Sequence, residues 1–458
     1  SQGSASGVEK ADHVRWQPSL VGIGVRVTSL SVSQHRALVD ALVEPLSPLE
    51  CTVAALPYGT GREGGASSGG VMATVNSTGL VLARDVTARL SVPPFTNSAM
   101  DGFAVRQADI VDAPVSLPVS GDVAAGDTRK HTLEPGTAMR IMTGAPLPQG
   151  ADTVVKVEET DHSAGASAAP SAVAILASPD EGTNVRAEGE DVNVGDPILP
   201  AGLSLTPAAV SAAVSVGYAS LPVYPRPRIG ILTTGRELVA PGSDLAEGQI
   251  PDSNGALIAG LVTQAGGDVV VQLRSTDNPR ALLAALDRAP DIDLLITAGG
   301  ISAGAYEVVR QALSFPTMRF HHVKQQPGGP QGIGTGRIGG KAVPVACLPG
   351  NPVSVYVSFH VYVAGMIRVL SGRTRSTEPV IREVVADAEW ASPRGKVQFI
   401  PLRSEGGLVR PVHELGSRSH LVASLSLANG LGVVEAAVER VKPADRLGFI
   451  ATEGGGCG

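Results

Sequence analysis

The stretch from Arg228 to Arg373 constrains the fold most, because short apolar strands and helices alternate along it. A strand of the parallel type is predicted at Ile229–Leu232, and further strands at "DVVVQLRST" and "DLLITAGG". Helices are predicted at "NGALIAGLVTQAG", "NPRALLAALDRA" and around "YEVVRQAL". Strands that alternate with helices fold as layers around a sheet, so we expect an open α/β domain with a parallel sheet.

The segments on either side have a different character. Short strands punctuated by Gly and Pro run from Val92 to about Gly189, and alternating strands and turns return from about Ser376. An early helix is predicted at "SVSQHRALVDALVEPL", where Ser31 and Gln34 form a capping box. A chain of 458 residues exceeds one ordinary core, so we expect three or four domains.

Composition excludes several classes of function. The net charge is −7 without a long Lys/Arg run, so we expect no nucleic-acid partner. Cys51, Cys347 and Cys457 show no CxxC spacing, which disfavours a disulfide framework or structural zinc and favours a reducing cytoplasm. We recognise no signal peptide and interpret the opening "SQGS" as a cloning remnant.

One apolar run, which begins at Val353, is about as long as a membrane span. It contains His360 and Arg368, and "LPGNP" separates it from the preceding strand. We therefore favour a buried helix packed on the sheet over a membrane-spanning helix, and expect no membrane insertion.

Candidate binding turns follow the strands of the α/β domain, where ligands of open sheets bind. Glycines allow backbone N–H groups to approach an anion, and a helix N-terminus adds a favourable dipole, so a phosphate-bearing ligand is indicated. Carboxylates beside phosphate oxygens form a usual magnesium environment. The turns contribute Thr233, Thr234, Gly235 and Glu237; Asp277; Gly299, Gly300, Ser302 and Gly304; and Pro349, Gly350, Asn351, Pro352 and Ser354.

Structural interpretations of the same residues stay open at this point. Glu237 is also explained as an early-helix acid, and Asp277 as a turn or cap residue. Asn351 and Ser354 are also explained as caps of a strand-to-helix connection. In the β-rich segment, "RIMTGAP" is also explained as an ordinary hairpin. The spacing matches neither GxGxxG nor a P-loop.

Six ordered motifs give the chain a resemblance to a known family. They are "PPFTNSAMDGFAV", "RIMTGAPLPQGAD", "EGED", "TTGREL", "GGISAG" and "LPGNPVS", and they cover about Ser31 to Gly432. The chain resembles the MoeA family, which includes the E domain of gephyrin. The resemblance implies an elongated homodimer of four-domain subunits. Domain I would comprise 27–91 and 190–225, domain II the β-rich insert 92–189, domain III the α/β molybdopterin-binding domain 226–375, and domain IV a C-terminal β barrel within 376–458.

The resemblance also implies a reaction, in which adenylylated molybdopterin and molybdate give molybdenum cofactor and AMP with Mg²⁺. Asp101, Thr143, Asp191, Glu237 and Asp277 match the functional acids and threonine of the family, with Glu307 at a further acid position. Asp191, Glu237 and Asp277 are the implied metal ligands. The family's site lies between two subunits, so Asp101 and Thr143 would complete the site of the partner subunit.

This sequence departs from the family pattern in the anion-binding region. The family's "KPGKP" loop reads "QPGGP" at Gln326–Pro330, which removes two cations from a loop expected to meet anions. Lys324 is a candidate substitute. Lys396 takes the place of an arginine, and Ser419 is retained as a candidate molybdate contact. The family's "FDNSAMDG" reads "FTNSAMDG" here, so Thr96 replaces an aspartate.

Two functions therefore stand as hypotheses. The first is a molybdopterin molybdenumtransferase that works with other enzymes of the molybdopterin pathway. The second is a dimeric scaffold like the gephyrin E domain, which binds a peptide of a membrane receptor or of a cell-division or cytoskeletal protein between domains III and IV.

Overall fold

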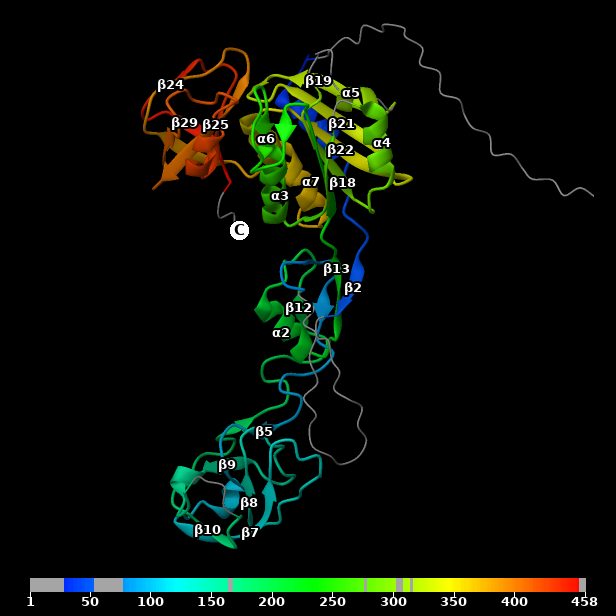
Figure 1. Ribbon diagram of the computed structural model, residues 1–458. Coiled ribbons are helices and arrows are strands. Elements are labelled where there is room, and N and C mark those ends of the chain that lie inside the picture. The colour runs from blue at the N-terminus through cyan, green and yellow to red at the C-terminus, as the bar shows by residue number, and fades with distance from the viewer. Residues whose placement is uncertain are drawn as a thin grey trace, which may run out of the picture.

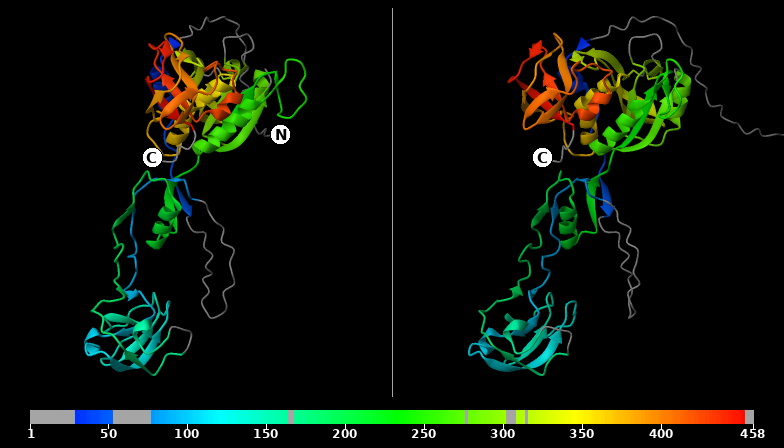
Figure 2. Two further views of the ribbon diagram at one scale, coloured as in Figure 1. Left: turned by 90° about the vertical axis from the view of Figure 1, so that its left-hand side faces the viewer. Right: turned by 60° about the vertical axis from the view of Figure 1, so that its left-hand side comes forward.

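A computed structural model describes residues 29–52, 77–163, 168–275, 278–301, 308–313 and 316–452. The chain forms an elongated molecule, with an α/β domain and a C-terminal barrel side by side at one end (Figure 1). A small middle domain follows, and a β-rich domain lies at the far end (Figure 2). Asp277, Ser302, Gly304, Glu307 and Cys457 lie outside the described residues.

The α/β domain is built on a seven-stranded sheet in the order β1-β19-β21-β22-β18-β14-β17. The open α/β domain is as expected, but the sheet, which was expected to be parallel, is mixed, because β21 runs antiparallel to its neighbours. The reason is a two-residue hairpin, Gly339–Gly340 with φ of 54° and 82°, which returns β21 directly into β22. The strands are β1 (Ser29–Leu30), β14 (Arg228–Thr234), β17 (Asp268–Ser275), β18 (Leu294–Ala298), β19 (Arg319–Val323), β21 (Pro330–Ile338) and β22 (Lys341–Leu348).

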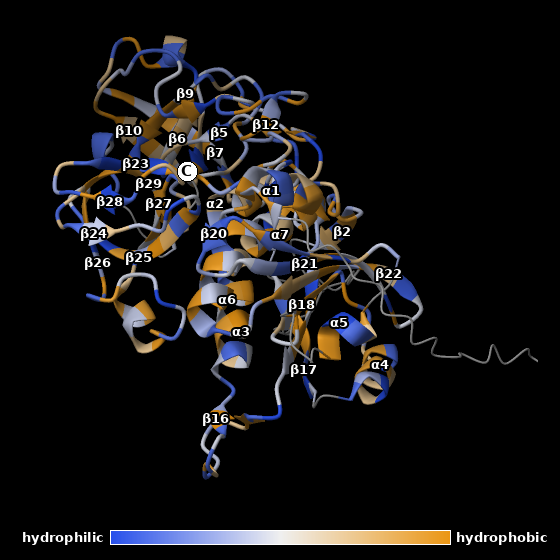
Figure 3. Ribbon diagram, turned by 90° about the horizontal axis from the view of Figure 1, so that it is seen from above, coloured by the Kyte–Doolittle hydropathy of each residue, from blue (hydrophilic) through white to orange (hydrophobic). Residues whose placement is uncertain are grey.

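Helices cover both faces of this sheet, which explains the continuous apolar strands. Along β14, Ile229 and Ile231 point to one core, while Leu232 points to the other. The first core contains α1 (Val32–Asp40), α3 (Ser253–Ala265), α6 (Pro352–Ser358) and α7 (Ala364–Leu370), and the second contains α4 (Pro279–Asp287) and α5 (Val308–Ala312). The outer helix α4 turns Leu282 and Leu286 to the sheet and exposes Arg280 and Asp287 to solvent (Figure 3), whereas α6 and α7 are buried almost all round.

The first helix begins as the sequence predicts. The Gln34 N–H donates to Ser31 Oγ at 3.1 Å, and the Ser31 N–H donates to Gln34 Oε1 at 2.8 Å, which completes the capping box. The helix packs on the α/β domain, where His35 and His321 form a buried hydrogen bond of 2.7 Å between ring nitrogens. By its contacts this helix is part of the α/β layers, although 27–91 was expected to form part of domain I.

The apolar run after "LPGNP" forms the buried helix that the sequence favoured. It is the one stretch of the described residues long and apolar enough to cross a membrane, Pro352–Leu370, and 89% of its apolar window is buried inside the protein. A π-helical turn at Phe359–Val363 joins α6 to α7. The Tyr362 hydroxyl in this turn donates to Gln325 Oε1.

The middle domain is small and is connected to the far domain by a narrow ribbon. Its sheet contains β2 (Leu49–Thr52), β13 (Ser220–Tyr224) and β3 (Val81–Leu82), covered by α2 (Pro207–Ser215). Thr206 caps α2 and Pro207 is its first residue, as predicted. Two passes of the chain then run antiparallel through the pairs β4–β12 and β5–β11 and a bridge between Val92 and Val192. These elements are β4 (Val86–Thr87), β5 (Asn97–Ser98), β11 (Val185–Arg186) and β12 (Pro197–Leu199).

The far domain is the predicted β-rich insert. Its five strands lie in the order β10-β7-β8-β6-β9. Apolar residues from alternating positions fill two cores, one on each side of β6, with Phe103 and Val105 in one and Ala104 in the other. The strands are β6 (Gly102–Val105), β7 (Val115–Val123), β8 (Ala138–Ile141), β9 (Thr153–Lys156) and β10 (Ala172–Ile175).

The C-terminal region forms the predicted β barrel. Five strands close on themselves in the order β25-β26-β23-β29-β27, because β27 pairs back with β25. They are β23 (Arg382–Ala386), β25 (Val397–Glu405), β26 (Leu408–Pro411), β27 (Gly430–Val434) and β29 (Arg446–Ala451). β20 (Gln325–Gln326) of the α/β domain extends the barrel sheet, and Phe399, Leu431 and Ile450 join the first α/β core.

Candidate active site

A cleft of about 650 Å³ opens at the carboxyl ends of β14, β18 and β22. These strands run parallel, so the turns that follow them meet at one edge of the sheet. The cleft brings together most of the turn residues that the sequence singled out. They are Thr234, Gly235, Glu237, Gly299, Gly300, Gly350, Asn351 and Pro352.

The Gly299–Gly300 turn lies directly against the end of β14. Both glycines have left-handed backbones, with φ of 90° and 67°. A Cβ at Gly299 would lie 2.6 Å from the Thr234 carbonyl oxygen, and one at Gly300 would lie 2.8 Å from Thr234 Oγ1. The turn therefore requires glycine, and the Gly299 N–H holds it to the end of β22 by donating to the Leu348 carbonyl at 3.1 Å.

Two buried side-chain oxygens line the cleft without a hydrogen-bond partner among the described residues, Thr234 Oγ1 and Asn254 Oδ1. Thr234 is 5% exposed and Asn254 is 6% exposed. A buried polar atom without a partner costs about 1–3 kcal/mol, so such atoms point to a missing partner. Both residues line the cleft, so this wall contains two acceptors that no described residue satisfies.

The start of α3 completes this wall, although the sequence pattern alone did not indicate it. Asn254 Nδ2 donates to the Gly350 carbonyl at 2.7 Å, which fixes the amide across the cleft. Asp252 caps α3 by accepting from the Gly255 N–H at 3.0 Å and accepts from the Thr233 hydroxyl at 2.6 Å. The signal was "PDSN", an aspartate cap just before an apolar helix.

Charge of both signs lies at the mouth of the cleft. Arg236 and Glu237 belong to the irregular segment between β14 and β15 (Leu238–Val239). The interpretation of Glu237 as an early-helix acid is wrong, because no helix begins until Ser253. The Glu237 carboxylate instead folds back over Gly235, where an added Cβ would lie 2.6 Å from Oε1.

The turn before α6 connects the cleft to the barrel. Asn351 occupies the N-cap position, yet its side chain makes no cap hydrogen bond; Asn351 Nδ2 donates to Ser419 Oγ at 3.0 Å. The Val353 N–H donates to the Ser419 carbonyl at 3.3 Å. Ser419 therefore lies beside the cleft, as does the buried Ser354 in the first turn of α6. Pro349 is buried at the end of β22.

Lys324 and the "QPGGP" loop lie outside the residues that line the cleft. Lys324 is exposed between β19 and β20, and its carbonyl accepts from Val397 of the barrel. Two buried glutamine side chains fix the backbone of the loop. Gln325 Nε2 donates to the Pro327 and Gly328 carbonyls, each at 3.1 Å, and Gln331 Nε2 donates to the Gly328 carbonyl at 2.8 Å.

Asp101 and Thr143 form a pair in the far β domain. Asp101 Oδ1 accepts from the Thr143 N–H and from the Thr143 hydroxyl, each at 2.7 Å. These two hydrogen bonds hold the pKa of the exposed Asp101 carboxyl below its usual range. Within one chain, the far domain with its strands β6 and β8 lies at the opposite end of the molecule from the α/β domain that holds the cleft (Figure 1).

The implied metal ligands are spread over the molecule. Glu237 lies at the cleft, and Asp191 is exposed on the ribbon, where its N–H donates to the Val92 carbonyl. Asp277 falls outside the described residues. The described part of the chain holds no cluster of three or more His, Cys, Asp or Glu side chains suited to a metal.

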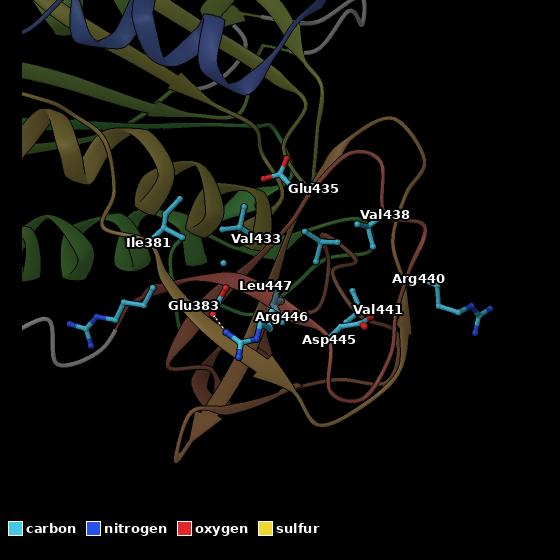
Figure 4. Close-up of a pocket in the computed structure, with 13 residues that line it drawn as sticks. Ile381, Glu383, Val433, Glu435, Val438, Arg440, Val441, Asp445, Arg446 and Leu447 are labelled. Carbon is cyan, nitrogen blue, oxygen red and sulfur yellow. Dashed lines mark hydrogen bonds and ion pairs between the residues drawn. The ribbon is translucent and has the colours of Figure 1, made fainter.

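A second cavity, of about 740 Å³, lies on the C-terminal barrel over β23, β27 and β29 (Figure 4). Val433, Val438 and Leu447 contribute apolar surface, and Glu435 and Arg440 lie at its margin. Glu383 and Arg446 form an ion pair on the same surface.

Most of the chain matches models of known protein families. Residues 30–217 match the MoeA N-terminal region (domain I and II), residues 230–369 match a probable molybdopterin binding domain, and residues 383–449 match the MoeA C-terminal region (domain IV).

Individual proteins show the same likeness. "Molybdopterin molybdenumtransferase 2" of Mycobacterium tuberculosis is 44% identical over 367 residues, which are 77% of this chain and 87% of that protein. "Molybdopterin molybdenumtransferase" of Nostoc sp. is 36% identical over 71% of this chain and 74% of its own. The crystal structure of the molybdopterin biosynthesis MoeA protein from Pyrococcus horikosii superimposes with a TM-score of 0.72 at 25% identity and covers 93% of this chain and 100% of that one.

Proposed function

The chain belongs to the MoeA family and is a transferase of molybdenum cofactor biosynthesis, and from that premise we propose that it inserts molybdate into adenylylated molybdopterin and releases AMP. The observation that carries the proposal is the pair of buried oxygens, Thr234 Oγ1 and Asn254 Oδ1, in a glycine-lined cleft at the sheet edge. A pterin offers N–H donors to such oxygens, and a phosphate suits the backbone N–H groups of the glycine turns.

The cleft residues would act by holding the ligand. Asn254 is already oriented by Gly350, so its carbonyl oxygen is fixed before a ligand arrives. Gly299 and Gly300 leave space beside Thr234 that any side chain would fill. Prearranged polar groups of this kind stabilise charge without reorganisation when the reaction occurs.

A magnesium ion fits this donor set only together with the substrate. Magnesium is usually bound by one or two carboxylates plus substrate phosphate oxygens, and Glu237 supplies a carboxylate at the cleft. Bound there, the ion would neutralise phosphate charge. Asp191 and Asp277 remain proposed ligands from the family resemblance.

We place the complete site between two copies of the chain. Asp101 is ionised and oriented by Thr143, but the β-rich domain that contains it lies at the other end of the chain from the α/β domain that holds the cleft (Figure 2). A homodimer would bring the far domain of one subunit to the cleft of the other, where Asp101 would orient water or metal at the phosphate. A cytoplasmic location and association with other molybdopterin-pathway enzymes complete the proposal.

The experiment is incubation of the purified protein with adenylylated molybdopterin, molybdate and Mg²⁺, followed by measurement of AMP. AMP formation that requires molybdate is expected, with loss of activity in Thr234→Val and Asn254→Leu. Absence of AMP, together with failure to restore molybdoenzyme activity in a strain that lacks the transferase, would refute the proposal.

A second candidate function is peptide binding at the barrel cavity. Val433, Val438 and Leu447 give the cavity an apolar surface, and Glu435 and Arg440 place opposite charges at its margin. This lining favours a peptide with an apolar side chain flanked by charged residues (Figure 4). We would identify a partner by pull-down and titrate its peptide by calorimetry. Val438→Asp should abolish binding and leave AMP release intact; equal affinity for that variant would contradict the assignment.

A further inference from the structure

A third cavity, of about 200 Å³, lies in the far β domain beside Asp101. It is far smaller than the cleft of the α/β domain, and smaller than the roughly 300–1,000 Å³ typical of sites that enclose a whole ligand. A cavity of this size suits one rigid fragment of a larger molecule. Its lining includes Asp101, Phe103, Arg140, Met142, Val157 and His162.

The lining is apolar inside and polar at the margin. Phe103 is 2% exposed and Val157 is 8% exposed, so both contribute buried apolar surface. The His162 ring lies 6.1 Å from the Phe103 ring between centroids, at an angle of 40°. Aromatic rings and a methionine sulfur favour a flat, polarisable ligand.

The charges at the margin disfavour an anion inside the cavity. Arg140 is already engaged by Asp122, with Nε donating to Oδ1 at 3.0 Å. Asp101 stays ionised, because Thr143 lowers its pKa, and it would repel a phosphate that entered without a cation. An uncharged ring that hydrogen-bonds at its edges is the better match.

We propose that this cavity receives the adenine base of the adenylylated substrate held in the cleft of the partner subunit. The inference rests on the proposed function, since it gives the leaving AMP its own recognition site. The phosphate would remain outside the cavity, with a cation between it and the Asp101 carboxylate, while the base enters between Met142 and His162. The inserted domain would thereby discriminate adenylylated from free molybdopterin.

The first test is direct binding, which does not depend on catalysis. Adenosine and ribose 5-phosphate are titrated by calorimetry into the full-length protein and into Met142→Trp, which fills the cavity. Adenosine affinity should fall at least about tenfold in Met142→Trp, while ribose 5-phosphate affinity stays unchanged. Leu176→Trp, an exposed position on the same domain, is the matched control and should bind adenosine normally.

The second test locates the base without any substitution, in case Met142→Trp folds poorly. Light-activated 8-azidoadenosine should label peptides that contain Met142 or His162. Label confined to peptides of the cleft, or unchanged adenosine affinity in a folded Met142→Trp, overturns the inference. Labelling at Met142 without AMP release would refute only the proposed function. AMP release together with labelling elsewhere would refute only the assignment of adenine to this cavity.

Discussion

At the scale of single residues, the Asp101–Thr143 pair shows how a surface acid is kept charged. Asp101 is exposed, yet two donors from one neighbour favour its ionised form. A carboxylate so placed stays negative at pH values where an ordinary aspartate begins to be protonated. Thr143 therefore acts through Asp101, as a positioning residue.

Replacing Thr143 with valine tests this role. The hydroxyl donor is lost, so the pKa of Asp101 should rise toward its usual range. Because a raised pKa means protonation at higher pH, the acid limb of the pH–rate profile for AMP release should shift to higher pH. Thr143→Ser keeps the hydroxyl and should retain the wild-type profile. Superimposable profiles for valine and wild type would show that the hydroxyl has no such role.

Gly299 provides a second prediction at this scale. An alanine there would be strained by its left-handed backbone and would also meet the Thr234 carbonyl at 2.6 Å. Gly299→Ala should weaken molybdopterin binding about tenfold or more and lower the melting temperature, by strain of roughly 1–3 kcal/mol. Gly242→Ala shares the backbone strain, with φ of 83°, but has no atoms within 4 Å. If Gly299→Ala and Gly242→Ala bind molybdopterin with the same affinity, the close approach of Gly299 to Thr234 does not affect binding.

At the scale of elements, α1 is held to the sheet by a buried histidine pair. Burial lowers the pKa of His35 to about 3 and also lowers the pKa of His321, so both rings are neutral in the folded protein. Tyr362 packs edge-on against His35, at 4.5 Å between ring centroids. The contact joins α1, β19 and the π turn.

This pair should make α1 sensitive to acid. Below about pH 6.5 the unfolded chain binds protons that the folded rings exclude, so stability falls as the pH drops from there toward 3. The loss is at most about 1.4 kcal/mol per pH unit for each histidine. The protection factors of the β19 amides, which are exchange rates corrected for the intrinsic effect of pH, should fall on acidification, and less so in His35→Gln. His420→Gln, an exposed change, is the control; identical acid responses in His35→Gln and wild type would contradict this account.

The elements also show what the sequence could and could not predict. Helix α1 and the glycine turns at Gly299 and Gly350 were predictable, because capping boxes and turn glycines act locally. The antiparallel β21 was not predicted because every second residue from Gly332 to Gly336 is glycine, and glycine is depleted in strands and typical of turns. Asn254 was missed because its importance comes from its hydrogen bond to Gly350, 96 residues away along the chain. The pairing of Asp101 with Thr143 likewise depends on strand register.

At the scale of the whole molecule, the distance between the far domain and the cleft predicts complementation. Asp101→Ala and Glu237→Gln should each abolish AMP release while the protein stays folded. When the two variants are mixed and their subunits exchange at random, each mixed dimer contains one intact site and one site with both substitutions. The mixture should therefore regain about a quarter of wild-type activity. Light scattering checks the dimer. If mixing restores nothing, although dimers exchange, both residues act within one chain.

The antiparallel ribbon between the middle and far domains has a mechanical consequence. The chain enters the far domain through β4 and β5 and returns through β11 and β12, so the domain is tethered twice. A single protease cut in either pass would leave the two halves held by the other pass and by the paired strands. The nicked protein should migrate as one species under native conditions and as two fragments when denatured, so the domain tolerates a severed backbone that would release a domain joined by a single linker.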